Sequence, residues 1–198
     1  MKQVLNASLV AVVLAMGSVP ARAALVSLTG NLAGDNATQF FSFTLAADAS
    51  VSLRSWSYAG GTNAAGSVIA AGGFDPVLAL FSGSGASAVL IGGNDDGIGV
   101  AADPTTGLAL DSLLDLSTLL AGTYTLALTQ VANFANGPTL ADGFLGAGSP
   151  GFGGRSSAWA VDVLGIDMPA SVPEPTALAL ALLGMAAAAA IRRQRLRD

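Results

Sequence analysis

Gln39-Phe-Phe-Ser-Phe-Thr-Leu45 is the stretch that indicates the fold class of this chain most directly. Phe41, Phe43 and Leu45 alternate with one serine and one threonine. Successive side chains of a β-strand point to opposite faces of the sheet, so this spacing places three apolar side chains on one face. The stretch therefore predicts a strand that is buried on one side only.

The same alternation, or a short apolar run bounded by turn residues, recurs along the chain. The predicted strands cover residues 24–29, 39–45, 50–58, 77–81, 88–91, 112–116, 122–130 and 158–166. No helical period occurs before Thr176. Eight short strands separated by turn chemistry predict an all-β fold, an antiparallel β-sandwich of jelly-roll-like type.

Two pairs of neighbouring strands are close enough in the sequence to predict hairpins. The first pair is 39–45 with 50–58, and the second is 77–81 with 88–91. The loop between these pairs, residues 60–73, is rich in glycine and alanine. Its length is typical of a functional or mobile connection.

The strand predicted at 50–58 contains a conflict of phase. Trp56 and Tyr58 fall on the face opposite Val51 and Leu53. Either both faces of this strand are partly covered, or a bulge changes its phase.

The first 23 residues have the three parts of a secretory signal peptide. Met1-Lys2 is positively charged, Val4 to Met16 is apolar, and Ala21-Arg22-Ala23 is a small-residue cleavage site. We expect residues 1–23 to form a signal helix that the Sec machinery recognises and that is removed before Ala24. A retained membrane anchor is the alternative.

The last 27 residues, 172–198, combine three physically distinct parts in a fixed order. Val172-Pro-Glu-Pro175 is an extended spacer, because Pro173 and Pro175 each fix φ and lack an N–H donor. Residues 177–191 are uncharged and mostly Ala and Leu, so they predict a transmembrane helix of roughly 23 Å. An amphipathic tail or core helix is the alternative, but this run has no polar face. Four arginines follow and favour retention of the end in the cytoplasm: Arg192, Arg193, Arg195 and Arg197.

This combination resembles the PEP-CTERM protein-sorting signal of Gram-negative bacteria. The resemblance covers residues 172–198 and includes Pro173, Glu174, Pro175 and the arginine cluster. It implies that an exosortase at the inner membrane recognises and removes the tail. The product is then expected at the cell surface or in the extracellular polysaccharide matrix.

The remaining segment, residues 24–171, has the size of one domain. It contains eleven aspartates and two arginines, a net charge of −9. Such a charge disfavours nucleic acid as a partner and suits calcium or another cation. The whole chain lacks His and Cys, and its one lysine is Lys2. The usual activated nucleophiles and zinc sites therefore have no residues from which to form, and we expect no enzymatic activity.

Acidic and amide side chains gather near predicted strand ends and form a candidate calcium site. The five candidate ligands are Asp75, Asn94, Asp95, Asp96 and Asp111. Calcium prefers six to eight hard oxygen ligands of this kind. Asn94 to Gly97 is also ordinary turn chemistry, which is the alternative. Three aromatic residues, Trp56, Phe74 and Trp159, can either line a sugar-binding face or belong to the core.

Several segments together resemble the bacterial pre-peptidase C-terminal domain and the DVUA0089-type domain of exported PEP-CTERM proteins. The matching stretches are 56–62, 74–81, 93–97, 111–114, 120–126 and 133–136. This resemblance implies a β-sandwich accessory domain without catalytic apparatus. We therefore expect a non-enzymatic surface or matrix protein, with a calcium-dependent carbohydrate-binding module as the alternative and exopolysaccharide as a candidate partner.

Overall fold

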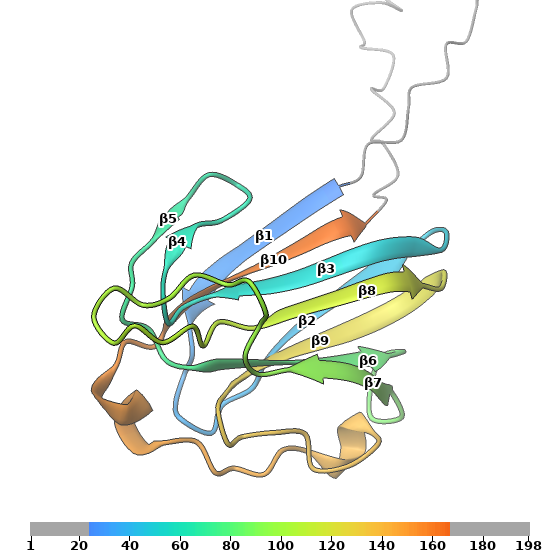
Figure 1. The fold of residues 1–198 in the computed structure, drawn as a ribbon. Helices are drawn as coiled ribbons and strands as arrows, with labels where there is room; N and C mark the ends of the chain where they lie inside the picture. Colours follow the sequence, from blue (N-terminus) through green and yellow to red (C-terminus); the bar gives the residue numbers. More distant parts are fainter. Residues whose placement is uncertain (1–23, 167–198) are drawn as a thin grey trace, which may run out of the picture.

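The computed structural model describes residues 24–166, which are built from strands, loops and two short 3-10 turns (Figure 1). The signal peptide, the Pro-Glu-Pro motif, the expected transmembrane helix and the four terminal arginines lie outside the described residues. The strands are β1 (Ala24–Asn31), β2 (Gln39–Leu45), β3 (Ala49–Trp56), β4 (Gly61–Thr62), β5 (Val68–Ile69), β6 (Pro76–Ser82), β7 (Val89–Asn94), β8 (Leu113–Leu119), β9 (Gly122–Gln130) and β10 (Ala158–Ile166). Two short 3-10 turns, Leu140–Asp142 and Pro150–Gly154, complete the described structure. Within residues 24–166 no helix is long and apolar enough to cross a bilayer.

Eight of the strands form two four-stranded antiparallel sheets. Sheet A has the order β1-β10-β3-β8, and sheet B has the order β2-β9-β6-β7. Among these eight strands, only β6 and β7 are both consecutive and in the same sheet. All other connections cross from one sheet to the other, which is the connectivity of a jelly-roll-like double sheet. The predicted all-β antiparallel architecture is confirmed.

One predicted hairpin is present and the other is not. β6 pairs with β7, as expected. β2 and β3 do not pair with each other, because β2 pairs with β9 and β3 pairs with β10 and β8. Each of the two strands has an apolar face, and placing them in opposite sheets lets both faces enter the same core. The prediction of a hairpin over 39–58 was therefore wrong.

The core lies between the sheets and takes its residues from both. Leu53, Val161 and Val163 of sheet A are each at most 2% exposed, and so are Leu126 and Leu128 of sheet B. The apolar faces predicted for 39–45, 122–130 and 158–166 all point into this core. Burial of these faces is the main term that stabilises the sandwich.

Two of the three candidate sugar-binding aromatics belong to the core. Phe74 is fully buried and Trp159 is 5% exposed, and both pack in the cluster between the sheets. The sugar-binding interpretation of these two residues was therefore wrong. The energy of burying such large rings outweighs any gain from displaying them.

Trp56 lies on the outer face of sheet A, where the β4–β5 hairpin covers it. Its indole N–H donates to Asp162 at 2.7 Å, and the Arg54 guanidinium stacks over its ring at 3.8 Å. A Cβ on Gly61 would lie 2.6 Å from the indole, so glycine is required for this close approach. The phase conflict in the sequence is thus resolved by partial cover of both faces. Residues 60–73, predicted as a plain loop, contain this small hairpin.

The outer face of sheet B is covered by the long loop of residues 131–148. Ala79, Phe81 and Ala127 point outward from the sheet and pack against Leu140 and Phe144 of the loop. The Leu90 N–H donates to the Pro138 carbonyl oxygen, and the Leu140 N–H donates to the Ala88 carbonyl oxygen. Through these hydrogen bonds the loop blocks part of the free edge of β7. This loop forms one wall of the candidate site.

Candidate cation site

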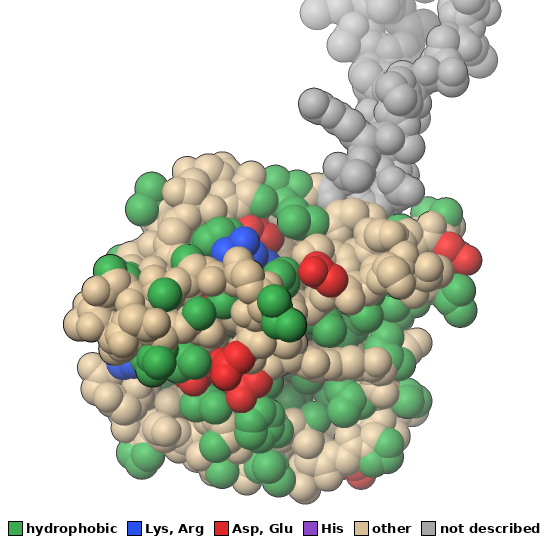
Figure 2. Space-filling view, in the orientation of Figure 1, with side chains coloured by type: hydrophobic (Ala, Val, Ile, Leu, Met, Phe, Trp, Pro, Cys, Tyr) green, Lys and Arg blue, Asp and Glu red, His purple; other side chains and the backbone are tan. Residues whose placement is uncertain are grey.

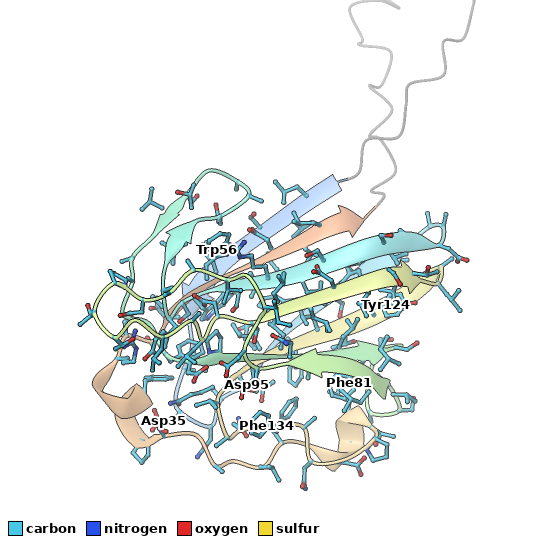
Figure 3. All side chains as sticks on the ribbon, viewed as in Figure 1. Asp35, Trp56, Phe81, Asp95, Tyr124 and Phe134 are labelled. Atoms are coloured by element: carbon cyan, nitrogen blue, oxygen red, sulfur yellow. The ribbon has the colours of Figure 1, made fainter. Side chains whose placement is uncertain are left out.

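Three of the five candidate ligands come together at one end of the β6–β7 hairpin. Asp75 immediately precedes β6, and Asp95 and Asp96 immediately follow β7. Because Leu78 pairs with Asn94 in antiparallel register, the start of β6 lies beside the end of β7. Carboxylate oxygens of the three aspartates lie within 4.8 Å of one another. We call these residues, Asp75, Asp95 and Asp96, the carboxylate trio; Figure 3 labels Asp95.

The environment of the trio disfavours negative charge. Burial, followed by the charges of Asp95, Asp96 and Asp111, raises the pKa of Asp75 from 3.8 to about 7, although Arg155 opposes this shift. Burial and then the charge of Asp96 raise the pKa of Asp95 as well. One oxygen of Asp75 and one of Asp95, the Oδ1 atom in each case, are buried and receive no hydrogen bond from the described residues. Among the described residues Arg155 offsets this concentration of acid only in part, which makes the trio a candidate cation site.

Asn94 has a different role from the one that the sequence suggested. Its side-chain oxygen accepts the Leu113 N–H at 2.8 Å, which joins the end of β7 to the start of β8. The buried hydroxyl of Ser112 lies 2.8 Å from the carbonyl oxygens of both Asn94 and Asp95. This contact fastens sheet B to sheet A at the site, and the Asn94 amide is already used within the fold.

Asp111 also serves the fold. Its carboxylate accepts the N–H groups of Ser57, Tyr58 and Ala59 at 2.7, 3.2 and 2.9 Å, and the Ser55 hydroxyl at 3.2 Å. Burial raises its pKa, while these four hydrogen bonds act in the opposite direction. Asp111 thus holds the segment that follows β3 and contributes only its charge to the trio. The five-residue calcium site is reduced to three carboxylates.

A further aspartate, Asp103, holds the loop that follows it, a structural role that was not predicted from the sequence. It accepts the Thr105 and Thr106 N–H groups and the Arg155 guanidinium, each at 2.7 or 2.8 Å. The hydrogen bond from Thr106, followed by that from Arg155, lowers the pKa of Asp103 to about 2. Arg155 also donates to the Tyr58 carbonyl and stacks on the Tyr58 ring. The only sequence signal for this pair is that residues 24–171 contain just two arginines.

An apolar cavity adjoins the trio. It has a volume of about 280 Å³ and lies between the outer side of β6–β7 and the 131–148 loop. Its walls are mainly aliphatic, with Val77, Ala79, Leu90 and Ala135 among them, together with Phe134. Asp95 lines one end. In the space-filling view, acidic side chains gather at one place on the surface and hydrophobic side chains border them (Figure 2).

Comparison with known proteins identifies the C-terminal segment. The described residues form two four-stranded antiparallel sheets that pack on a common core, and the segment predicted to sort the protein follows them in the sequence. Residues 171–195 match the PEP-CTERM protein-sorting motif, so the chain carries this sorting signal, and the resemblance inferred for the C-terminal segment is confirmed. The motif indicates an exported protein that is anchored in the membrane in transit and processed by an exosortase. No curated protein matches the chain.

Proposed function

We propose that this protein is a non-enzymatic component of the cell surface or of the extracellular polysaccharide matrix, which the exosortase releases as a folded β-sandwich. The observation that carries the proposal is the sorting motif at residues 171–195, directly after the last strand, β10. β10 ends at Ile166, before the motif begins, so cleavage at the motif leaves all ten described strands in the released product.

The pairing of the first and last described strands supports release of a folded domain. β1 begins beside the end of β10, with Ala24 paired to Ile166 (Figure 1). β10 is a central strand of sheet A, between β1 and β3. Sheet A is therefore complete only once β10 has been exported and paired, and the motif begins five residues after β10 ends.

The side chains support a role without catalysis. The chain has no His, no Cys and no Lys beyond Lys2, which removes the usual general bases and activated nucleophiles. Asp103 and Asp111, the most buried carboxylates near the site, are both occupied by structural hydrogen bonds.

The arginine cluster gives the sharpest test of delivery. Replacing Arg192, Arg193, Arg195 and Arg197 by Glu removes the positive charge that retains the tail in the cytoplasm, so we expect processing to fail. Replacing the same four residues by Lys keeps the charge, and processing should persist. The masses of the cell-associated and released proteins measure the result. An unchanged mature mass in the glutamate variant contradicts the proposed topology.

A further inference from the structure

The lining of the cavity beside Asp95 is of two chemical kinds. Val77, Ala79, Leu90, Phe134 and Ala135 offer no side-chain hydrogen-bond donor or acceptor. Asn94 and Asp95 are its polar side chains, and the Asp95 carboxylate, which belongs to the trio, is the one charged group of the lining. An occupant that fits both kinds of surface carries a cationic group on an apolar stem.

Neither arginine of the described residues lines this cavity. Arg155 is bonded to Asp103, and Arg54 stacks on Trp56 on the outer face of sheet A. A cation bound here gains charge complementarity that no side chain of the lining provides.

The lining distinguishes among cationic and polar ligands. A hydroxylated sugar ring requires several polar partners along its length, whereas the polar side chains of this lining are Asp95 and Asn94, and the Asn94 oxygen already accepts the Leu113 N–H. A bare metal ion uses the carboxylates but leaves the cavity unfilled. Phe134, 38% exposed, adds an aromatic ring of the kind that attracts ammonium groups (Figure 3).

We propose that this cavity binds an aliphatic ammonium group on an apolar stem, the chemistry shared by a lysine side chain and a free alkylamine. The ammonium group lies against Asp95 and its neighbours, and the stem lies against the β6 wall and Phe134. The volume of about 280 Å³ lies below the usual range for whole drug-sized ligands and suits a group of side-chain size.

A chain-length series tests the proposal on the full chain in nonionic detergent at pH 8. Ammonium, methyl-, propyl- and n-butylammonium chlorides are titrated at constant ionic strength, and binding is followed by calorimetry and by the melting temperature. We expect each added methylene to tighten binding about two- to fourfold. Equal binding of ammonium and n-butylammonium overturns the proposal, because the cavity then plays no part. Stabilisation by calcium with no response to any amine also overturns it, in favour of a metal site.

Two variants and matched controls locate the binding. Asp95→Asn should weaken n-butylammonium binding at least tenfold, and Phe134→Ala should reduce the dependence on chain length. Asp115→Asn and Leu120→Ala change an exposed acid and an exposed leucine elsewhere, so they should leave binding unchanged. Melting curves of all four variants in the same detergent report whether each is folded. Folded Asp95→Asn protein that binds n-butylammonium as tightly as the unaltered chain contradicts the assignment.

Peptides distinguish the two sources of the amine. A short peptide with one lysine should compete with n-butylammonium, whereas the same peptide with the lysine Nε-acetylated should not. Competition by the lysine peptide supports a protein partner. Binding of free n-butylammonium without peptide competition supports a small amine. Competition by both peptides alike overturns recognition of the ammonium group.

Discussion

Two groups of aspartates near the same end of the sandwich have opposite surroundings. Asp103 and Asp111 are each 2% exposed and receive three and four hydrogen bonds, respectively. The carboxylate trio is less buried, yet Asp75 and Asp95 each have a buried oxygen with no donor. The supply of N–H and O–H groups, rather than depth of burial, separates acids that hold the fold from acids that are free to bind. This contrast can be tested by removing members of each group.

Asp111→Ala should have the largest effect on stability. It leaves the N–H groups of Ser57, Tyr58 and Ala59 without their acceptor in a buried place. We expect the free energy of unfolding to fall by roughly 3 kcal/mol, measured by urea denaturation. The exposed Asp115→Ala is the control and should change it by less than about 0.5 kcal/mol. Similar values for both variants would show that Asp111 does not hold this segment.

Asp75→Asn should raise the free energy of unfolding at alkaline pH, whereas Asp111→Ala lowers it. The folded-state pKa of Asp75 is about 7 against an ordinary 3.8, so the folded protein holds a proton that the unfolded chain releases. This stabilisation is complete below about pH 4 and is lost as the pH rises through about 7. The full shift corresponds to about 4 kcal/mol, and solvent screening of this partly exposed carboxyl reduces it to about 2 kcal/mol.

The asparagine variant removes both the proton and the repulsion from Asp95, Asp96 and Asp111. We therefore expect it to be more stable than the unaltered protein at pH 8 by about 1 to 2 kcal/mol, and to lose most of the decline in stability between pH 5 and pH 8. Urea denaturation at several pH values measures both quantities. Asp115→Asn should keep the decline. A variant that is less stable at pH 8 would show that Asp75 belongs with the structural acids.

The sequence predicts part of this arrangement for identifiable reasons. Alternation located the strands, and the β6–β7 hairpin already implied that Asp75, Asp95 and Asp96 meet, because they flank the two strands at its open end. Alternation does not specify which strand pairs with which, so the separation of β2 from β3 was not predictable. Interactions between residues distant in the sequence also decided the roles of the other acids. Asp111 accepts N–H groups more than 50 residues earlier, and Asp103 pairs with Arg155 52 residues later. Local sequence carries no sign of either partner.

Calcium should give the smallest effect and the finest test of the contrast. With Asp111 and Asn94 occupied, the trio supplies only carboxylates, and water must complete the six to eight oxygens that calcium prefers. Calcium at ten times its Kd stabilises the folded protein by about 1.4 kcal/mol, since it binds the folded form alone. We expect calcium to raise the melting temperature correspondingly at pH 8 and to raise it less at pH 6, where Asp75 is protonated. Calcium should not raise the melting temperature of Asp95→Asn. Magnesium at matched ionic strength should stabilise the protein less, because it dehydrates reluctantly and requires a tighter octahedral site.

Asp111→Asn should keep the calcium response at a lower melting temperature, because its carboxylate is not a ligand. Loss of the response in that variant would place Asp111 in the binding group and remove the distinction between the two sets of acids.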